Sequence, residues 1–185
     1  MKYFRPCSAF ISVRNLRAMF IYCPKCKNKL KTEKNQHWCS ECGFKYYRNP
    51  SPAVGVILVN SKNQIYLIKR AKDPRAGFWD SPGGFINFYE TAEEAARREV
   101  KEEIGIQIGE LYYLGSYTND YLYHDIEYAP LDLFFFAKAE FDDAKKFDLE
   151  EILEGKFFDL EDLPMDKIAF KSNKKALKEY LIIHR

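Results

Sequence analysis

The sequence lacks any run of eighteen apolar residues, the length that a helix needs to span a membrane. Its longest apolar-rich run, LFFFAKA from Leu133, is long enough only for a strand. Internal repeats and low-complexity tracts are missing as well. What the chain does have is 185 residues, of which 46% are hydrophobic, with many Tyr and Phe. This composition predicts one main domain with a real core, and room for a small appendage.

Acidic residues are scarce in the first quarter of the chain. Residues 1–48 carry eleven Lys or Arg and two acids, a net charge of +9, whereas residues 49–185 carry eighteen and twenty-five, a net charge of −7. This asymmetry predicts two units with different tasks. Residues 1–19 are interpreted as a disordered tail or an overlong start, with a transit-like leader as the alternative. Their apolar residues are too scattered for a secretory signal.

Cysteine is used sparingly, and four of the five cysteines stand as two close pairs, CPKC and CSEC. Two C-x2-C pairs separated by twelve residues can surround one tetrahedral Zn²⁺. Four thiolates leave no open coordination position, so the predicted zinc is structural; chance clustering or redox use is the alternative. Such thiolates favour a reducing compartment, and we expect a cytoplasmic protein. The predicted ligands of this small unit, residues 20–48, are Cys23, Cys26, Cys39 and Cys42.

The rest of the chain, residues 49–185, mixes strand and helix patterns behind the Pro-rich hinge NPSPA at 49–53. Thr91 and Glu94 form a capping box, and Gly105 is a typical helix end. An α/β or α+β fold with a mixed set of strands is expected. The predicted elements are strands at 53–60, 65–70, 111–121, 127–140 and 155–160, helices at 91–105 and 172–184, and loops at 71–85 and near His124.

The end of the first predicted helix carries an unusual cluster of acids in RREVKEEIG. Carboxylates destabilise a helix C-terminus and repel one another at three- and four-residue spacing. Glu99, Glu102 and Glu103 nevertheless fall within about a 100° arc of the helix. Hard cations such as Mg²⁺ prefer oxygen ligands and share them with substrate phosphates. The pattern predicts a divalent-metal site, and its alternative is an exposed acidic helix end.

The wider pattern, GFINFYETAEEAARREVKEEIGI from Gly84, resembles the Nudix box, the signature of the Nudix hydrolases, at every fixed position. The resemblance covers about residues 52–170 and implies a Nudix α/β/α sandwich. It also implies Mg²⁺- or Mn²⁺-dependent cleavage of a nucleoside diphosphate linked to another group, X. Glu99, Glu102, Glu103 and the carbonyl of Gly84 would hold the metal. Glu90 and Arg98 match the pair that braces the loop against the helix.

Other positions outside the box are weaker candidates. The resemblance implies a general base before the last strand, where Glu151 is the first choice and Glu150 and Glu154 follow; all three are otherwise ordinary surface charges. Arg70 could meet a phosphate or form a surface salt bridge. Two aromatic residues could stack on a base or simply belong to the core. These are Phe78 and Tyr117.

The four-cysteine segment resembles the zinc ribbon of NADH pyrophosphatases and related bacterial proteins. The chain departs from them after the box, where GSYTNDYLYHD replaces their SQPWPFPxS-type motif. The proline that marks many ADP-ribose pyrophosphatases is also missing, because Tyr121 stands near its place. The sequence therefore leaves the X group open among NADH, ADP-ribose, nucleotide sugars and dinucleoside polyphosphates.

Three functions compete on these observations. The favoured one is a metal-dependent Nudix pyrophosphohydrolase that acts on a nucleotide-derived small molecule, with a zinc ion that stabilises the fold. The second is a nucleic-acid-binding or RNA end-processing protein, because aromatic residues are interleaved with Lys in the basic unit. The third is a ligand sensor without turnover. Relatives often pair, so a homodimer is compatible with the sequence.

Overall fold

The computed structural model describes residues 21–123, 126–141 and 150–184, and the chain divides into two compact units, Met1–Asn49 and Pro50–Arg185. The predicted leader or tail at 1–19 and the predicted loop near His124 lie outside the described residues. No helix in the described part of the chain is long and apolar enough to cross a membrane.

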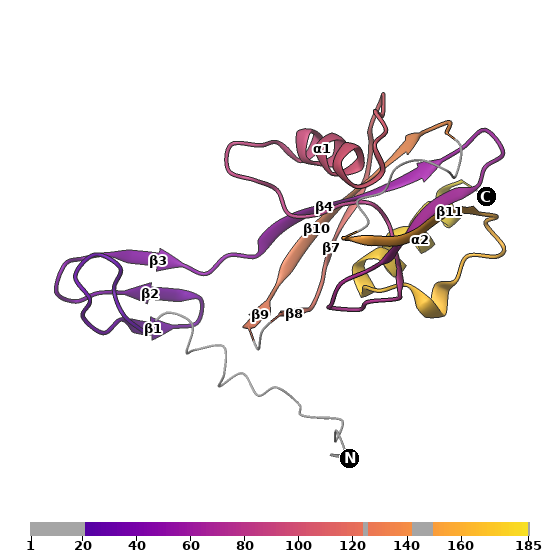
Figure 1. The fold of residues 1–185 in the computed structure, drawn as a ribbon. Coiled ribbons are helices and arrows are strands. Elements are labelled where there is room, and N and C mark those ends of the chain that lie inside the picture. Colours follow the sequence, from indigo (N-terminus) through magenta and orange to yellow (C-terminus); the bar gives the residue numbers. More distant parts are fainter. Residues whose placement is uncertain (1–20, 124–125, 142–149, 185) are drawn as a thin grey trace, which may run out of the picture. The chain divides into compact units, whose positions relative to one another are not determined.

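The first unit is built on a small antiparallel sheet (Figure 1). Its strands pair in the order β1-β2-β3, and His37 on the central strand is 2% exposed. The Thr32 hydroxyl lies 3.0 Å from Nδ1 of His37, which satisfies this buried ring. The strands are β1 (Lys31–Glu33), β2 (Gln36–Trp38) and β3 (Lys45–Tyr47).

The second unit contains a mixed sheet with the strand order β11-β5-β4-β10-β7, and β6 pairs with β5 at its side. The central pair, β4 and β10, is parallel, which explains why both strands are rich in apolar residues. A separate hairpin joins β8 to β9. The strands are β4 (Ser51–Val59), β5 (Ile65–Arg70), β6 (Trp79–Asp80), β7 (Tyr112–Thr118), β8 (Tyr121–Tyr123), β9 (Ile126–Tyr128), β10 (Pro130–Lys138) and β11 (Ile152–Phe158).

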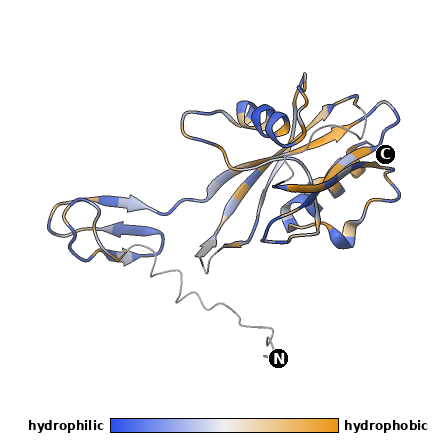
Figure 2. Ribbon diagram, in the orientation of Figure 1, coloured by the Kyte–Doolittle hydropathy of each residue, from blue (hydrophilic) through white to orange (hydrophobic). Residues whose placement is uncertain are grey.

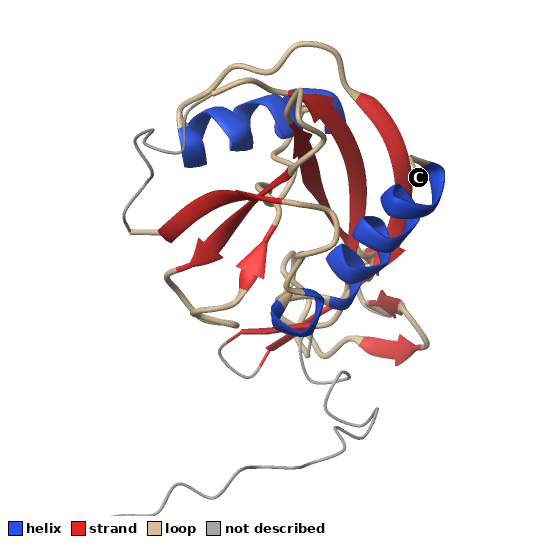
Figure 3. Ribbon diagram, turned by 90° about the vertical axis from the view of Figure 1, so that its right-hand side faces the viewer, coloured by secondary structure: helices blue, strands red, loops and turns tan. Residues whose placement is uncertain are grey.

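Two α-helices in the described residues cover the sheet, and Figure 3 shows them on its two sides. Helix α1 (Ala92–Ile104) packs its small and branched residues, such as Ala95 and Val100, on one face. Helix α2 (Lys171–Ile183) packs Leu177 and Tyr180 on the other face. Hydrophobic residues are concentrated along the strands between them (Figure 2). The predicted α+β sandwich with a mixed sheet is confirmed.

Several element boundaries agree with the predictions, and four differ. The predicted strand 127–140 is divided between β9 and β10. The predicted strand 111–121 is divided between β7 and β8, because β7 pairs with β10 whereas β8 pairs with β9. The last strand begins at Ile152 rather than at Gly155. The predicted long loop contains the short strand β6, whose Trp79 and Asp80 pair with β5. These pairings depend on neighbours distant in sequence.

Candidate functional site

A cavity of about 680 Å³ lies in the second unit, and the acidic end of α1 contributes to its lining. The helix begins with the predicted capping box: the Glu94 N–H donates to the Thr91 hydroxyl, and the Glu94 carboxylate accepts from the Thr91 N–H. It ends at Gly105, whose φ of 70° is left-handed and whose N–H donates to the Lys101 carbonyl. Local sequence thus fixes the helix that positions the carboxylates.

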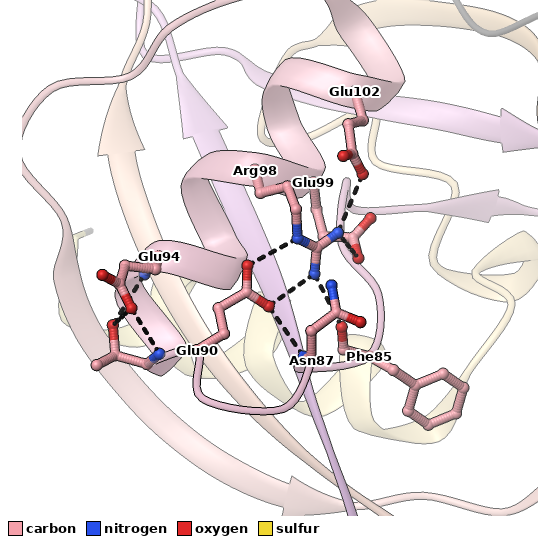
Figure 4. A network of polar contacts seen from close by, with 8 residues as sticks. Phe85, Asn87, Glu90, Glu94, Arg98, Glu99 and Glu102 are labelled. Atoms are coloured by element: carbon pink, nitrogen blue, oxygen red, sulfur yellow. Dashed lines mark hydrogen bonds and ion pairs between the residues drawn. The ribbon is translucent and has the colours of Figure 1, made fainter.

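Arg98 is the centre of the polar network at this helix (Figure 4). It binds Glu90 through two nitrogens, at 2.7 and 2.9 Å, and donates to the carbonyl of Phe85 at 3.0 Å. Its hydrogen bonds lower the pKa of Glu90 to about 2. Arg98 also contacts Glu99 at 2.7 Å and Glu102 at 3.0 Å. One guanidinium therefore links the loop before the helix to two of the clustered carboxylates.

The three carboxylates of the cluster have different environments. The Glu103 residue is 8% exposed, whereas the side chains of Glu99 and Glu102 are 14% and 60% exposed. Burial raises the pKa of Glu103 well above its ordinary value, although the Gly83 N–H donates to this carboxylate at 2.9 Å. Burial also raises the pKa of Glu99. Keeping two carboxylates in such surroundings costs stability, which is typical of functional sites.

Two successive glycines bring the main chain close to this cluster. A Cβ atom at Gly83 would lie 2.1 Å from the Val54 carbonyl oxygen, and one at Gly84 would lie 2.5 Å from Oε1 of Glu99. Only residues without a side chain fit there. The Gly84 carbonyl accepts from the Val54 N–H at 2.8 Å, which anchors it beside β4. A carbonyl oxygen has a second lone pair, so this contact leaves it one for a ligand.

The other predicted site residues are brought together only in part. Arg70 and Glu151 line the cavity with Gly84, Glu99, Glu102 and Glu103. Arg70 also pairs with Asp80 at 3.3 Å and donates to the Pro74 carbonyl. Neither Glu150 nor Glu154 is among the lining residues; each pairs with a lysine, Lys72 and Lys69 respectively.

The two aromatic candidates lie elsewhere. Phe78 contacts the Arg75 guanidinium at 5.7 Å, and Tyr117 packs against the core beside Phe134. Neither lines the cavity, so the structure gives no support to the stacking roles proposed for them. Their prediction relied on residue type alone. The aromatic residues that do line the cavity are Phe85, Tyr121, Phe134 and Phe170.

Sequence reasoning missed a second group of cavity residues, which is buried and polar. It comes from strands β6 and β10, from the turn before β8 and from the first turn of α2. One signal was available: Asp132 interrupts the apolar strand PLDLFFF, where a charge is unexpected. The group consists of Asp80, Ser81, Asn119, Asp132, Ser172 and Asn173.

The four cysteines form the second candidate site. Their sulfur atoms all lie within 4.8 Å of one another, and none forms a disulfide. Each C-x2-C pair is followed by a residue with left-handed backbone, Lys27 (φ 65°) and Gly43 (φ 69°). Each of these residues donates its N–H back to the first cysteine of its pair, Cys23 or Cys39. The two matching turns aim four sulfurs at one point, as a tetrahedral Zn²⁺ requires.

The pKa values of the four thiols differ: although the Phe44 N–H lowers it, burial and the neighbouring cysteine side chains raise the pKa of Cys42 to about 12. Burial alone would raise the pKa of Cys23, but N–H groups of Cys26 and Lys25 lower it to about 7. In the described part of the chain, no other group of three or more His, Cys, Asp or Glu side chains brings its ligand atoms within the same 4.8 Å. The carboxylates of α1 are thus less tightly gathered than the sulfurs.

The profile of the NUDIX domain family matches residues 49–180 of this chain. The chain belongs to the Nudix family. The resemblance to the Nudix hydrolases and the prediction of a Nudix-type hydrolase are therefore confirmed. The four clustered cysteines are compatible with the predicted zinc ribbon.

Several Nudix relatives are similar over different parts of the chain. An ADP-ribose pyrophosphatase from Methanocaldococcus jannaschii is 37% identical over 142 residues, which cover 75% of this chain and 77% of that protein. The NAD-capped RNA hydrolase NudC from Haemophilus influenzae is 34% identical over 99 residues, 51% of this chain. NudC from Escherichia coli is 29% identical over 148 residues, 78% of this chain. The matches span only 37% and 53% of these two NudC proteins.

Solved structures agree with the Nudix fold. A Nudix hydrolase from Nitrosomonas europaea superposes with a TM-score of 0.67 and 27% identity, covering 88% of this chain and 91% of that one. A MutT Nudix hydrolase from Burkholderia pseudomallei has a TM-score of 0.61 and 27% identity, covering 71% and 98% of the two chains.

Proposed function

We propose that this Nudix protein is a Mg²⁺- or Mn²⁺-dependent pyrophosphohydrolase that cleaves a nucleoside diphosphate linked to a second group X. Its products are a nucleoside monophosphate and phosphorylated X. The observation that carries the proposal is the shared cavity: Glu99, Glu102, Glu103 and Gly84 line the same space of about 680 Å³. The function of the relative from M. jannaschii supports ADP-ribose as a substrate to test first.

The donor set suits a hard divalent cation. It contains only oxygen atoms, from three carboxylates and from the Gly84 carbonyl, and such ligands select Mg²⁺ or Mn²⁺ over softer metals. Because Gly84 approaches Glu99 closely, the main-chain metal ligand lies beside a carboxylate ligand. A bound cation would polarise phosphoryl oxygens and acidify a coordinated water. We infer that Glu99, Glu102, Glu103 and the Gly84 carbonyl hold it.

The chain's own residues would supply positioning and proton transfer. Glu151 lies before β11, lines the cavity and is close enough to raise the pKa values of Glu99 and Glu103 by like-charge repulsion. A carboxylate in that place can accept the proton of an attacking water. Lys72, 3.9 Å from Glu151, and Arg70 add positive charge to the same lining, where it would attract a diphosphate.

A substrate panel tests this proposal. The purified full chain is incubated with ADP-ribose, NADH, a nucleotide sugar and a dinucleoside polyphosphate, with Mg²⁺, with Mn²⁺ or with a chelator. Released monophosphate is measured by chromatography. We expect hydrolysis of at least one member that disappears with the chelator. The proposal is refuted if no member of the panel is hydrolysed with either metal, or if the chelator leaves hydrolysis unchanged.

A second candidate, binding of RNA by the first unit, is favoured by the surface of that unit. Tyr22 and Tyr47 are 60% and 52% exposed, and residues 21–48 hold seven Lys or Arg against two acids. Exposed aromatic rings among cations are typical of platforms for single-stranded nucleic acid. The relatives called NAD-capped RNA hydrolase make this candidate worth testing.

Salt dependence separates the two candidates. Binding of a labelled single-stranded RNA should weaken steeply between 50 and 200 mM salt if the first unit contacts phosphates. Replacing Lys29, Lys31 and Lys45 with Gln should then weaken binding, whereas the same change at Lys174, Lys175 and Lys178 on α2 should not. If both triple variants weaken RNA binding equally, the binding depends on the overall positive charge of the protein and not on a site in the first unit.

A further inference from the structure

The cavity contains buried polar groups that the proposed hydrolysis does not use. Asp132 on β10, Asn119 before β8 and Ser172 in the first turn of α2 are 8%, 7% and 1% exposed. They come from three elements that are distant in sequence, yet all three line the cavity. Burying polar groups costs free energy unless hydrogen bonds compensate it. The hydrogen bonds of each group therefore decide what the group is for.

A neighbouring buried group in the same cavity is fully occupied by the protein itself. The Asp80 carboxylate accepts from the Asn173 amide at 2.6 Å, from the Ser81 N–H at 3.1 Å and from Arg70 at 3.3 Å. The Ser81 hydroxyl donates in turn to the side-chain amide oxygen of Asn173. This closed network holds β6 against the start of α2, so Asp80 has a structural explanation.

The group around Asp132 has fewer protein partners, the side chains of Ser172 and Asn119. The hydroxyl of Ser172 is buried and has no hydrogen-bond partner of normal geometry among the described residues. It lies near enough to Asp132, with Asn119, to oppose the increase in pKa that burial gives this carboxyl. The side-chain amide oxygen of Asn119 already accepts from the Asp120 N–H, so the NH₂ group of this side chain is the remaining donor. The cavity is thus lined by one strong acceptor, Asp132, next to two donors.

Aromatic side chains line the cavity near this polar group. Tyr121 lies 5.9 Å from both Phe85 and Phe170, measured between ring centroids. Phe170 immediately precedes α2 and is covered on one side by the Arg70 guanidinium, 5.0 Å from the ring centroid. Flat ligand rings pack against aromatic side chains and are oriented by a few polar groups at their edge. The lining supplies both kinds of contact.

We propose that Asp132, Ser172 and Asn119 form a specificity subsite for a flat heteroaromatic ring whose edge carries an N–H donor beside an acceptor. Asp132 accepts from the N–H group, and Ser172 or Asn119 donates to the neighbouring acceptor. The amino edge of adenine and the carboxamide of a nicotinamide ring share this chemistry. The subsite rests on the proposed function, because it places one end of the substrate while the carboxylates of α1 act on the diphosphate.

Binding of mononucleotides tests the subsite without catalysis. Ligand-observed NMR titrations of the full chain compare AMP with purine riboside monophosphate, which lacks only the amino group. A second pair compares nicotinamide mononucleotide with its nicotinic acid analogue, in which a carboxylate replaces the carboxamide. We expect the first member of at least one pair to bind about 10- to 100-fold more tightly, since a charge-assisted hydrogen bond is lost in the other. The pair that discriminates identifies the ring.

Three variants connect this preference to the residues. Asp132→Asn should abolish the preference, whereas Asp159→Asn, the same change at an exposed position outside the cavity, should leave it intact. Ser172→Ala and Asn119→Ala each remove one of the two candidate donors, and at least one of these variants should weaken binding of the preferred ligand.

The proposal is overturned if neither pair discriminates, or if Asp132→Asn keeps the wild-type preference. It is also overturned if Ser172→Ala and Asn119→Ala each bind the preferred ligand as tightly as the wild type. A failure of the hydrolysis panel with selective binding intact would contradict the proposed function and leave the subsite standing. Hydrolysis without any ring preference would contradict the subsite and leave the proposed function standing.

Discussion

The two candidate metal sites of this protein are built in opposite ways. The four sulfurs of the first unit converge within 4.8 Å, and short left-handed turns after each cysteine pair fix them. The carboxylates of α1 instead keep separate protein partners: Arg98 for Glu99 and Glu102, and the Gly83 N–H for Glu103. A closed sulfur site suits a structural ion, whereas carboxylates around an open cavity suit a site that must share its ion with a substrate.

Breaking the sulfur site should give the largest effect. Cys39→Ser removes one of four ligands, and zinc binding and folding are coupled by about 10 kcal/mol or more in small zinc domains. We expect the variant to lose zinc, measured by metal analysis, and to lose the amide protection of residues 21–48 in hydrogen exchange. The second unit should keep its own protection.

Cys7→Ser is the matched control, since it makes the same chemical change outside the four-cysteine cluster. It should retain zinc and protection. A Cys39→Ser protein that still held one zinc ion per chain would refute the assignment of the four-cysteine site.

The ion pair between Glu90 and Arg98, beside the carboxylate site, can be tested through the pH dependence of the protein's stability. Arg98 lowers the pKa of Glu90 from 4.5 to about 2, so the ionised carboxylate stabilises the fold above pH 4.5. That stabilisation is lost as the pH falls through about 2. Glu90→Gln should therefore unfold at a lower urea concentration than the wild type at pH 7, and the difference should shrink steadily below pH 4.5.

Glu93→Gln changes an exposed glutamate in the first turn of α1 and serves as the control for Glu90→Gln, which lies just before that helix. Its urea midpoint should stay close to that of the wild type at neutral pH. A gap between Glu90→Gln and wild type that is the same at pH 7 and pH 3 would show that the Arg98 pair does not carry the effect.

The smallest effect is expected at the start of α1, far from its acidic end. Thr91→Ala removes the N-cap and should lower the free energy of unfolding by about 1 kcal/mol. Thr91→Ser keeps a capping hydroxyl and should be nearly neutral. Urea unfolding of the two variants measures this difference; equal stabilities would mean that the cap contributes nothing to positioning the helix.

Local spacing made much of this molecule predictable. The four cysteines and the helix from Thr91 to Gly105 are defined by residues within one short segment each, and the mixed fold follows from the strand and helix patterns. The cavity's second polar group was not predictable in the same way. Asp132 and Ser172 meet only because β10 pairs with β4 and α2 packs across that face.

Residue type alone did not predict which aromatic residues line the cavity. Phe78 and Tyr117 are the predicted candidates for stacking on a base, but Phe78 lies against Arg75 and Tyr117 packs against the core. Tyr121 and Phe170 line the cavity instead, and nothing in their local sequence marks them. Placement in the cavity depends on which face of a strand or helix meets the sheet, and this is set by long-range packing.

The most direct test of the account is the activity of Glu102→Gln. Glu102 is the most exposed carboxylate of the cluster, so its replacement should change stability by no more than about 0.5 kcal/mol. With the best substrate of the panel and saturating Mg²⁺, kcat should fall by about 10²-fold or more, since one charged ligand is lost at the reacting diphosphate. Lys101→Gln, on the adjacent position, should keep near wild-type kcat. A folded Glu102→Gln protein with wild-type kcat would contradict the claim that these carboxylates hold the metal for hydrolysis.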